Sequence, residues 1–491
     1  MQLLFLLMIE QTMNGKKRMM YSDRVCRLMC FIPAVMIMAI LTSGCVLLHP
    51  TDPYATASRL NVTSMDNPAD LQDERTPQAD LQAPLTLAEA IRIALANNPE
   101  INAAQWDVAA AGSRLDAARA GRYPILSAEG RYQHSLDDQR MIAARYDGEP
   151  GIFDQDIYRG DLILRLPLFT GGRLTNEIRA AELLSQSEEK RLSYTREELV
   201  FNVSSTFYAM LSQEEVIRSL EFSINAMQEH RKQVSDLLAL QKAARVDLLR
   251  SEVRLADLRQ SMVRERNVLA IEKRYLANLL GIEDNGDQLS VNGLLTFEEP
   301  VMENTGDLVA VALKRRNDYL AAQTRLEAQA RRVDAVRAGH WPAVSALGSY
   351  GVTATGSSER EDVGTIGLGV SMPLFEGGRI EAQIRQERAV LAASQERLRK
   401  LALQIRREVE TALLDIQSGS ERIQATRQSI EQAKESLRIE RMKYDLGSGS
   451  ITDVLDAQSA LLQSETNYAR ALADFHIANA RLAFATGENS L

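Results

Sequence analysis

Two different hydrophobic periods divide the chain into helical and extended stretches. Residues 173–280 contain neither Gly nor Pro, and apolar side chains recur there every seven residues. The members of this series are Leu248, Leu255, Met262, Leu269 and Leu276. Heptad spacing without a breaker predicts long helices with coiled-coil packing, interrupted once near Ala243. A helix from Arg173 to about Leu240 would be ~100 Å long at 1.5 Å per residue.

The heptad spacing returns towards the C-terminal end. Two apolar series repeat every seven residues: Ile416, Ile423, Ile430, Leu437 and Tyr444, then Val454, Leu461, Tyr468, Phe475 and Leu482. A row of small residues has the same spacing: Ala457, Ser464, Ala471, Ala478 and Ala485. Small side chains let neighbouring helices approach closely. We therefore expect a second pair of long, closely packed helices.

A period of two marks extended stretches ahead of each long helical segment. Apolar residues alternate with polar or small ones in two places: Tyr158, Leu162, Leu164, Leu166 and Leu168, and Ile366, Leu368, Val370, Met372 and Leu374. Partner stretches begin at Tyr123 and Trp341. The pattern predicts four strands of about 10–12 residues, each with one apolar face.

These elements occur twice, in the same order. Residues 120–124 are echoed at 338–342, an offset of 218, and residues 167–173 at 373–379, an offset of 206. The chain therefore consists of duplicated helix–strand–strand–helix halves. The first half has 12 more residues between these landmarks, and we expect them in its hairpin loop, where insertions are tolerated. Shorter helices precede the strands of the first half, about Leu87–Asn97 and roughly Glu100–Ala120, and Gly121 ends the second of them.

Strands of this length can cross a bilayer when tilted. Their apolar face suits lipid and their polar face suits water. Four strands cannot close a barrel around a lumen, because ~8 is the usual minimum, and unpaired backbone groups are costly in hydrocarbon. Several chains are therefore expected to share one barrel, with Tyr123 and Trp341 at the membrane interface. The alternative is a soluble four-stranded sheet with one face on a core.

The N-terminal region has the features of an export signal. Five basic residues precede an apolar run over 28–41: Lys16, Lys17, Arg18, Arg24 and Arg27. The run is too short for a comfortable membrane span but suits a signal peptide. It ends in Leu41-Thr42-Ser43-Gly44-Cys45, which resembles the lipobox of bacterial lipoproteins, although Thr42 stands where Leu is usual. The resemblance implies cleavage before Cys45, diacylglycerol and an acyl chain on Cys45, and, because Val46 follows, sorting to the outer membrane. An uncleaved anchor or a plain secretory signal is the alternative.

Charge and composition exclude several function classes. The net charge is −9 and the body has no basic cluster, which argues against a nucleic-acid partner. The three Cys lie within the first 45 residues, and no two of the five His have metal-ligand spacing. We recognise no nucleophile–base pair, so we expect no enzyme activity, no catalytic residue, no metal and no cofactor beyond the acyl groups.

Several of these motifs together resemble one family. The two Pro-Leu-Phe-x-Gly-Gly-Arg elbows contribute Pro167, Gly171, Gly172, Pro373, Gly377 and Gly378. With the duplicated halves and the run from Tyr444-Asp445-Leu446-Gly447 to Gly487, they resemble the TolC-type outer membrane efflux proteins, more closely the lipidated OprM-like branch. The resemblance covers roughly Leu85 to Gly487. It implies a mainly α protein with a membrane β-barrel portion: a homotrimer with a shared 12-stranded outer-membrane barrel and a helical α-barrel across the periplasm. It also implies an exit duct for an inner-membrane pump, joined to it by a periplasmic adaptor.

The resemblance further implies a gate where each long helix turns back. Asp453 and Asp456 match the acidic ring that constricts the family's pore, and Asp247 matches the equivalent position in the first half. Tyr444 matches a Tyr that helps to hold the tip closed, whereas Gly449 stands where the best-known member has an Arg. The alternative is that Asp247 and Asp453 are only the N-caps of the returning helices.

These expectations divide the chain into six segments. They are a lipoprotein signal peptide (1–44), a lipidated tether (45–84), a first efflux repeat (85–281), a linker (282–306), a second repeat (307–487) and a short tail (488–491). Two other functions remain open: a duct for secreted proteins or polysaccharide, and a non-conducting coiled-coil spacer lipoprotein of the periplasm.

Overall fold

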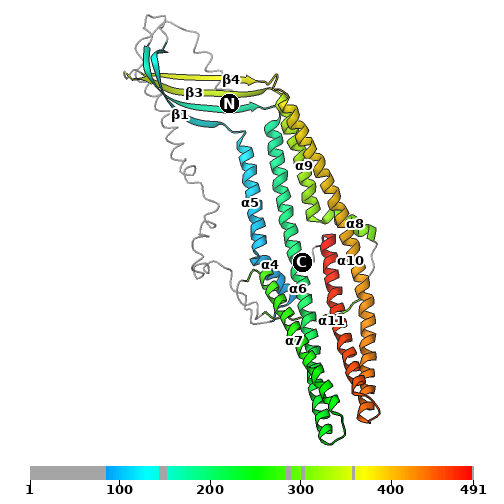
Figure 1. The fold of residues 1–491 in the computed structure, drawn as a ribbon. Helices are drawn as coiled ribbons and strands as arrows, with labels where there is room; N and C mark the ends of the chain where they lie inside the picture. The colour runs from blue at the N-terminus through cyan, green and yellow to red at the C-terminus, as the bar shows by residue number, and fades with distance from the viewer. Residues whose placement is uncertain (1–83, 143–151, 283–288, 300–304, 357–359, 489–491) are drawn as a thin grey trace. The chain divides into compact units, whose positions relative to one another are not determined.

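The computed structural model describes residues 84–142, 152–282, 289–299, 305–356 and 360–488 (Figure 1). The chain divides into two units, residues 1–78 and 79–491, and every described residue belongs to the second. The predicted signal peptide and Cys45 therefore lie outside the described residues, as does the predicted tether apart from Pro84.

Each half of the described chain has short helices, a β-hairpin and then two longer helices. The first half contains α4 (Leu87–Asn97), α5 (Pro99–Ala120), β1 (Ile125–Ile142), β2 (Ile152–Phe169), α6 (Arg173–Ala239) and α7 (Arg245–Leu279). The second contains α8 (Thr305–Arg315), α9 (Asn317–Arg337), the 3-10 helix η4 (Ala338–His340), β3 (Ala343–Thr355), β4 (Arg360–Ser371), α10 (Arg379–Asp445) and α11 (Ile451–Thr486). The predicted break near Ala243 is confirmed, because α6 ends at Ala239 and α7 begins at Arg245. Helices α6 and α10 each have 67 residues, which corresponds to ~100 Å at 1.5 Å per residue. Of the helices that the structure describes, none combines the length and apolar character that a membrane span requires.

Caps define where the helices begin. The Thr86 side chain accepts a hydrogen bond from the Glu89 backbone N–H, and the Glu89 carboxylate accepts one from the Thr86 N–H, which together make a capping box at α4. Asn98 accepts from the Glu100 N–H at 2.8 Å and so caps α5. The long helices α6 and α10 begin differently: their N-caps are Gly172 (φ 89°) and Gly378 (φ 81°), in the left-handed region that favours glycine. The predicted Gly-Gly elbows are therefore tight turns from strand to helix.

The four strands form one antiparallel sheet in the order β1-β2-β3-β4. The central pair joins the two halves, with Leu162 opposite Tyr350, and leaves β1 and β4 at the edges. Strands β1 and β2 have 18 residues each, whereas β3 has 13 and β4 has 12. The predicted length of about 10–12 residues is therefore wrong for the first hairpin. Its insertion lengthens the strands as well as the loop, and β1 accommodates this through shifts of register after His134 and after Arg140.

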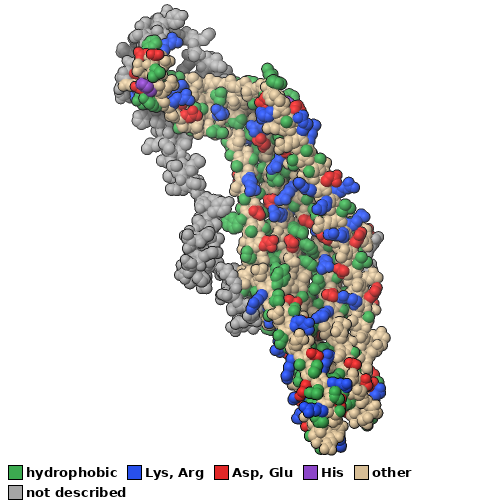
Figure 2. Space-filling view, viewed as in Figure 1, with side chains coloured by type: hydrophobic (Ala, Val, Ile, Leu, Met, Phe, Trp, Pro, Cys, Tyr) green, Lys and Arg blue, Asp and Glu red, His purple; other side chains and the backbone are tan. Residues whose placement is uncertain are grey.

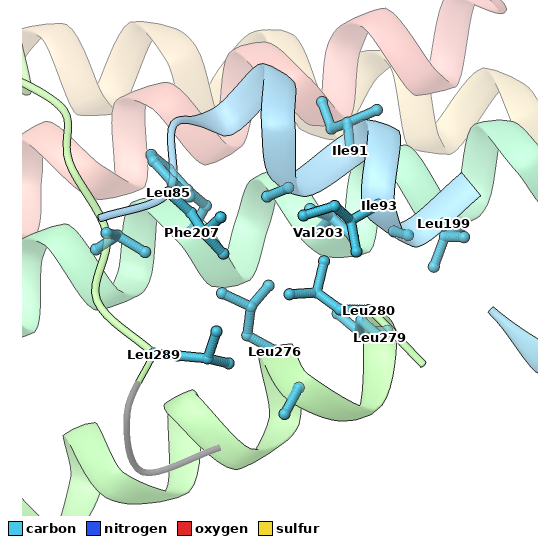
Figure 3. Close-up of a cluster of buried hydrophobic side chains, with 14 of the residues drawn as sticks. Leu85, Ile91, Ile93, Leu199, Val203, Phe207, Leu276, Leu279, Leu280 and Leu289 are labelled. Carbon is cyan, nitrogen blue, oxygen red and sulfur yellow. The ribbon is translucent and has the colours of Figure 1, made fainter. Parts of the chain in front are cut away.

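The apolar stripes of the helices meet in several buried clusters. The largest lies between α4, α6 and α7, where Ile93, Val203 and Leu276 pack together, and Leu289 of the following segment covers them (Figure 3). A second cluster joins α6, α7 and α11. The predicted row of small residues is buried on α11, at Ala457, Ser464, Ala471, Ala478 and Ala485. The heptad pattern thus describes real packing, between the halves as well as within them.

The helix surfaces are mixed in charge. On the face shown in Figure 2, blue and red side chains alternate along the helices, with apolar side chains between them. Many of these charges form exposed pairs three or four residues apart, such as Arg173–Glu177 at 2.9 Å and Arg438–Glu435 at 2.6 Å. Exposed pairs of this kind contribute little to stability, so they mainly keep the surface solvated.

Candidate functional site

One face of the sheet is apolar and exposed. It presents large side chains from all four strands: Leu126, Tyr132, Tyr158, Leu162, Leu164, Tyr350, Ile366, Leu368 and Val370. Ile366 is 96% exposed. A contiguous apolar face of this extent marks a surface that meets another apolar medium. No described helix packs across this face. Its large apolar side chains suit contact with lipid.

The opposite face carries charges. Side chains alternate between the two faces along a strand, and the residues of β1 and β2 on this second face include Glu129, Arg131, Arg159, Asp161 and Arg165. Like charges stand directly opposite each other, Glu129 against Asp161 and Arg131 against Arg159, an arrangement that is unfavourable for strand pairing. The Arg159 Nε–Asp161 Oδ2 pair at 2.7 Å compensates for part of it. Because such a face requires water, the sheet separates an apolar side from an aqueous one.

Aromatic residues mark both ends of the strands. Where helix meets strand, Tyr123 is 67% and Trp341 is 63% exposed. Towards the hairpin tips, the Tyr132 and Tyr158 rings stack with centroids 4.9 Å apart, and the Tyr132 hydroxyl donates to Asp156 at 2.8 Å. A strand of about 10 residues between these levels spans ~33 Å, or ~25 Å when tilted, which is the height of the apolar band of a membrane barrel. Aromatic rings at both limits of such a band are typical of membrane interfaces.

At the end of the long helices that is far from the sheet, a first turn joins α6 to α7 and a second turn joins α10 to α11. In the second turn, Gly447 has φ 73° and the Ser450 side chain caps α11 by accepting from the Thr452 N–H at 3.1 Å. A Cβ on Gly449 would lie 2.9 Å from Lys443 Cβ and 3.0 Å from the Tyr444 backbone N. A side chain at position 449 would therefore require this turn to rearrange.

Comparison with known proteins decides the family. Residues 90–282 and 308–488 match the family described as outer membrane efflux protein. The chain belongs to this family. The prediction of a TolC-type outer-membrane efflux channel is thereby confirmed, with its place in the outer membrane and its helical body in the periplasm.

Individual relatives share about a quarter of the sequence or less. The protease secretion protein PrtF of Dickeya chrysanthemi is 26% identical over 380 residues, covering 76% of this chain and 81% of the relative. The outer membrane protein TolC of Escherichia coli K12 is 21% identical, with 82% of each chain covered. The toluene efflux pump outer membrane protein TtgC of Pseudomonas putida is 24% identical, covering 77% of this chain and 78% of the relative.

Solved structures show the same fold. The outer-membrane channel OprN superposes with a TM-score of 0.68 at 21% identity, over 82% of this chain and 89% of that one. VceC of Vibrio cholerae superposes with a TM-score of 0.69 at 20% identity, over 82% and 96%. The predicted fold class, mainly α with a four-stranded contribution to a membrane barrel, is confirmed.

Within this family fold, the predicted gate residues of the efflux protein lie around the two turns. Asp247 and Asp453 each occupy the first turn of a returning helix, but the N-caps are Ala244 and Ser450. The alternative that the two Asp residues are N-caps is therefore wrong. An acidic residue in the first turn still lies near the positive end of the helix dipole, which is favourable. Asp453 and Asp456 are exposed, whereas Asp247 is half-buried.

Tyr444 lies between the two helix pairs. Its ring packs against His230 of α6, with centroids 5.6 Å apart. Burial raises the pKa of Tyr444, and the nearby carboxylates of Asp247 and Asp445 raise it further. Burial lowers the pKa of His230, with Arg441 acting in the same direction and Asp445 opposing it. The structure thus brings Tyr444 and Asp247 into one neighbourhood.

Two arginines that the sequence reading missed link the returning helices. Arg250 Nη1 of α7 donates to Thr452 Oγ1 of α11 at 3.1 Å, and Arg254 donates to Ser459 of the same helix. In the sequence these arginines look like any others on a solvated helix face. Their partners lie about 200 residues away, so only the fold identifies them.

Proposed function

We propose that the chain is one third of a passive exit duct of the outer membrane, closed by three copies. The observation that carries the proposal is the sheet: four strands with an apolar face, a charged face and two edges, β1 and β4, that no other described strand pairs with. Backbone groups at a free edge cannot remain unpaired in hydrocarbon. Three copies supply twelve strands, enough for a barrel with a water-filled lumen. The charged face then lines that lumen.

The long helices continue the duct on the periplasmic side, and its far end is the gate. We assign the gate to Asp247, Tyr444, Asp453 and Asp456. Three copies of two exposed carboxylates around a narrow axis would attract cations and repel anions. Opening would require the contacts of Arg250 and Arg254 with α11 to be exchanged or broken.

The duct needs partners, because this chain supplies no energy source in our proposal. A periplasmic adaptor would join the tip to an inner-membrane pump, and one relative, TtgC, is named as the outer membrane protein of a toluene efflux pump. The proposal includes no catalytic role and no metal. It includes an N-terminal lipid anchor, with diacylglycerol and an acyl chain on Cys45 holding the mature chain to the membrane.

A second cargo class is favoured by one observation. Two relatives, PrtF and AprF, are named as protease secretion proteins, and PrtF is 26% identical. A duct for secreted proteins is therefore the second candidate. A non-conducting spacer is the least favoured, since it has no use for a sheet with one lipid-like and one charged face.

Conductance in a planar bilayer tests the duct and its gate together. The wild type is compared with the double variant Asp453→Ala, Asp456→Ala, and with the control Glu410→Ala, Glu431→Ala, which removes two exposed carboxylates of α10 away from the tip. We expect small cation-selective openings that grow or lose selectivity only in the tip variant. Equal channels in all three proteins would refute the gate and keep the duct. A folded oligomer that never conducts would overturn the duct in favour of the spacer.

A further inference from the structure

The helix pairs of the two halves differ at equivalent buried positions. One heptad row of α7 consists of Ser251, Leu258, Glu265, Glu272 and Leu279. The offset of 206 takes this row to the buried row of small residues on α11. Glu265 and Glu272 therefore stand where the second half has Ala471 and Ala478. Two carboxylates have entered a row that the other half fills with methyl groups.

The first of these carboxylates is provided with hydrogen-bond donors. Gln213 of α6 is 7% exposed, and its Nε2 donates to the Glu265 carbonyl at 2.9 Å and to Glu265 Oε2 at 2.8 Å. Arg470 of α11 also approaches Glu265 Oε2, at 3.8 Å. The counterpart of Gln213 is Gly419 of α10, where a Cβ would lie 3.4 Å from Phe475 Cα. The level that is closely packed in the second half is thus a satisfied polar contact in the first.

The second carboxylate, Glu272, lacks such a donor. Its Oε2 is buried and accepts no hydrogen bond from any residue that the structure describes. On the same face of α7 it lies between Leu269 and Leu276; Leu276 belongs to the largest apolar cluster (Figure 3), and Leu269 packs against that cluster. An ionised carboxylate without a donor is costly in such surroundings. Protonation removes the charge and with it most of this cost.

The charges around Glu272 do not compensate for it. The neighbouring helices and its own contribute these charged residues: Glu198 and Glu214 on α6, Glu265, Arg266, Lys273 and Arg274 on α7, Arg470 on α11, and Glu89 and Arg92 on α4. Helix α6 has no charged residue from 199 to 213, along the stretch that packs on this part of α7. Burial raises the pKa of Glu272 to about 7, and the Glu265 carboxylate adds to the rise. Lys273 acts instead on Glu214, where it opposes the rise in pKa that burial causes.

From this arrangement we propose that Glu272 is a proton-binding site of the α6–α7 pair, and that loss of its proton loosens the packing of the two helices. With the proton bound, the side chain completes the apolar contact beside Leu276. Without it, the carboxylate has to draw in water or a cation, and either one separates α6 from α7. The site does not depend on the duct, because it lies within one chain.

Loosening at Glu272 has a consequence for the tip. Helix α7 runs from Glu272 to Arg254 over ~27 Å at 1.5 Å per residue. Arg254 and Arg250 are the residues through which α7 holds α11. A less firmly packed α7 holds α11 less well, so deprotonation favours opening. This consequence rests on the gate proposed above, whereas the proton site does not.

The pH dependence of unfolding tests the proton site. A carboxyl group with a pKa of about 7 in the folded chain and 4.5 in the unfolded one binds more protons when folded, so its contribution to stability falls as the pH rises through this window. Glu272→Gln keeps the shape of the protonated group and cannot ionise. We expect its midpoint of thermal unfolding in detergent, followed by circular dichroism, to lie about 2 °C or more above the wild type at pH 8 and to match it at pH 5.

Two further variants keep this test decisive. Glu252→Gln is the matched control, because Glu252 is an exposed carboxylate of the same helix, and its midpoint should follow the wild type at both pH values. Glu272→Ala copies the counterpart Ala478, and its midpoint should fall less than that of the wild type between pH 5 and pH 8. Equal midpoints of the wild type and Glu272→Gln at pH 8, or the same rise in Glu252→Gln, would overturn the proton site.

Hydrogen exchange locates the effect in the chain. At pH 8 the amides of residues 262–279 should exchange severalfold more slowly in Glu272→Gln than in the wild type, while those of α8 and α9 should not change. Comparison at a single pH removes the intrinsic pH dependence of exchange. A uniform change along the whole chain would contradict a site between α6 and α7.

Conductance separates the site from its consequence. The wild type should open more often at pH 8 than at pH 6, and Glu272→Gln should lose this increase. If Glu272→Gln keeps the increase while its unfolding behaves as expected, the link to the gate is wrong and the proton site stands. A folded oligomer that never conducts would overturn the duct and leave the proton site intact.

Discussion

Arg316 shows how one buried charge can hold a helix junction. Its side chain is 2% exposed between α8 and α9, where it pairs with Asp318 at 2.7 Å and with Glu408 of α10, and lies over the Phe484 ring. The counterpart in the first half is Asn98, whose amide donates to the Leu279 carbonyl at 2.9 Å. The same junction is thus built once with a neutral amide and once with an ion network.

Removing this guanidinium leaves two carboxylates in a partly desolvated site. We expect Arg316→Met to destabilise the folded protein by about 3–5 kcal/mol, the range for breaking a buried pair. The measurement is the midpoint of thermal unfolding in detergent by circular dichroism. The control Arg325→Met removes an exposed cation that pairs with Glu188, and should cost under about 1 kcal/mol. Equal midpoints for the two variants would contradict the assignment.

One of the two N-caps that the structure shows, in place of Asp247 and Asp453, could have been predicted from the sequence. Ser450 and Asp453 have the spacing of a capping box, so Ser450 was recognisable as the N-cap of α11. Ala244 was not, because it caps α7 without a side-chain hydrogen bond. The His230–Tyr444 contact and the Arg250–Thr452 bond join residues more than 200 positions apart, and no local pattern marks such pairs.

At the scale of elements, periodicity was sufficient for the helices and less so for the strands. The heptad pattern continues without Gly or Pro through most of each helical segment. It therefore predicts only one turn in each, between α6 and α7 and between α10 and α11. Strand length was harder to predict, because the alternation weakens towards the hairpin tips, where charged residues such as Asp137 and Asp138 occur. The added length of β1 depends on register shifts, which follow from pairing with β2 and not from the sequence of β1 alone.

Close packing between β2 and β3 makes one glycine critical. A Cβ on Gly351 would lie 2.1 Å from Asp161 Oδ1 and 2.6 Å from the Gly160 carbonyl; the side chain can move, but the backbone cannot without parting the strands. We expect Gly351→Ala to reduce the fraction of SDS-resistant oligomer severalfold on unheated gels, since it disturbs the pairing that joins the halves. Gly348→Ala is the control, because its Cβ would find its closest neighbour at 3.7 Å. Oligomer yields that match in the two variants would argue against this account.

For the whole molecule, the charged face of the sheet is expected to influence which ions pass through the barrel. On its charged face, Arg131 and Arg159 stand side by side, next to the carboxylates of Glu129 and Asp161. Both signs are present, so the barrel is expected to be less ion-selective than the acidic gate proposed at Asp453 and Asp456. The duplication, the elbows and the alternation were enough to predict this architecture, whereas the register between the halves required coordinates.

Reversing one of these charges should be visible in the ion selectivity. In the background Asp453→Ala, Asp456→Ala, which removes two carboxylates of the proposed gate, Arg131→Glu should shift the reversal potential in a salt gradient towards cation preference. Tyr350→Phe on the apolar face serves as the control. An unchanged reversal potential in Arg131→Glu would mean that this face does not line the conducting path.

The fusion of two similar halves also bears on how fast a ring can close. The contact of α6 and β2 with α9 and β3 forms within one polypeptide, where its two sides meet at the high effective concentration of tethered groups. A ring built from separate halves would have to form twice as many contacts between chains by diffusion, and would expose more open strand edges while doing so. Joining the halves therefore shortens the interval during which unpaired strands are available for aggregation.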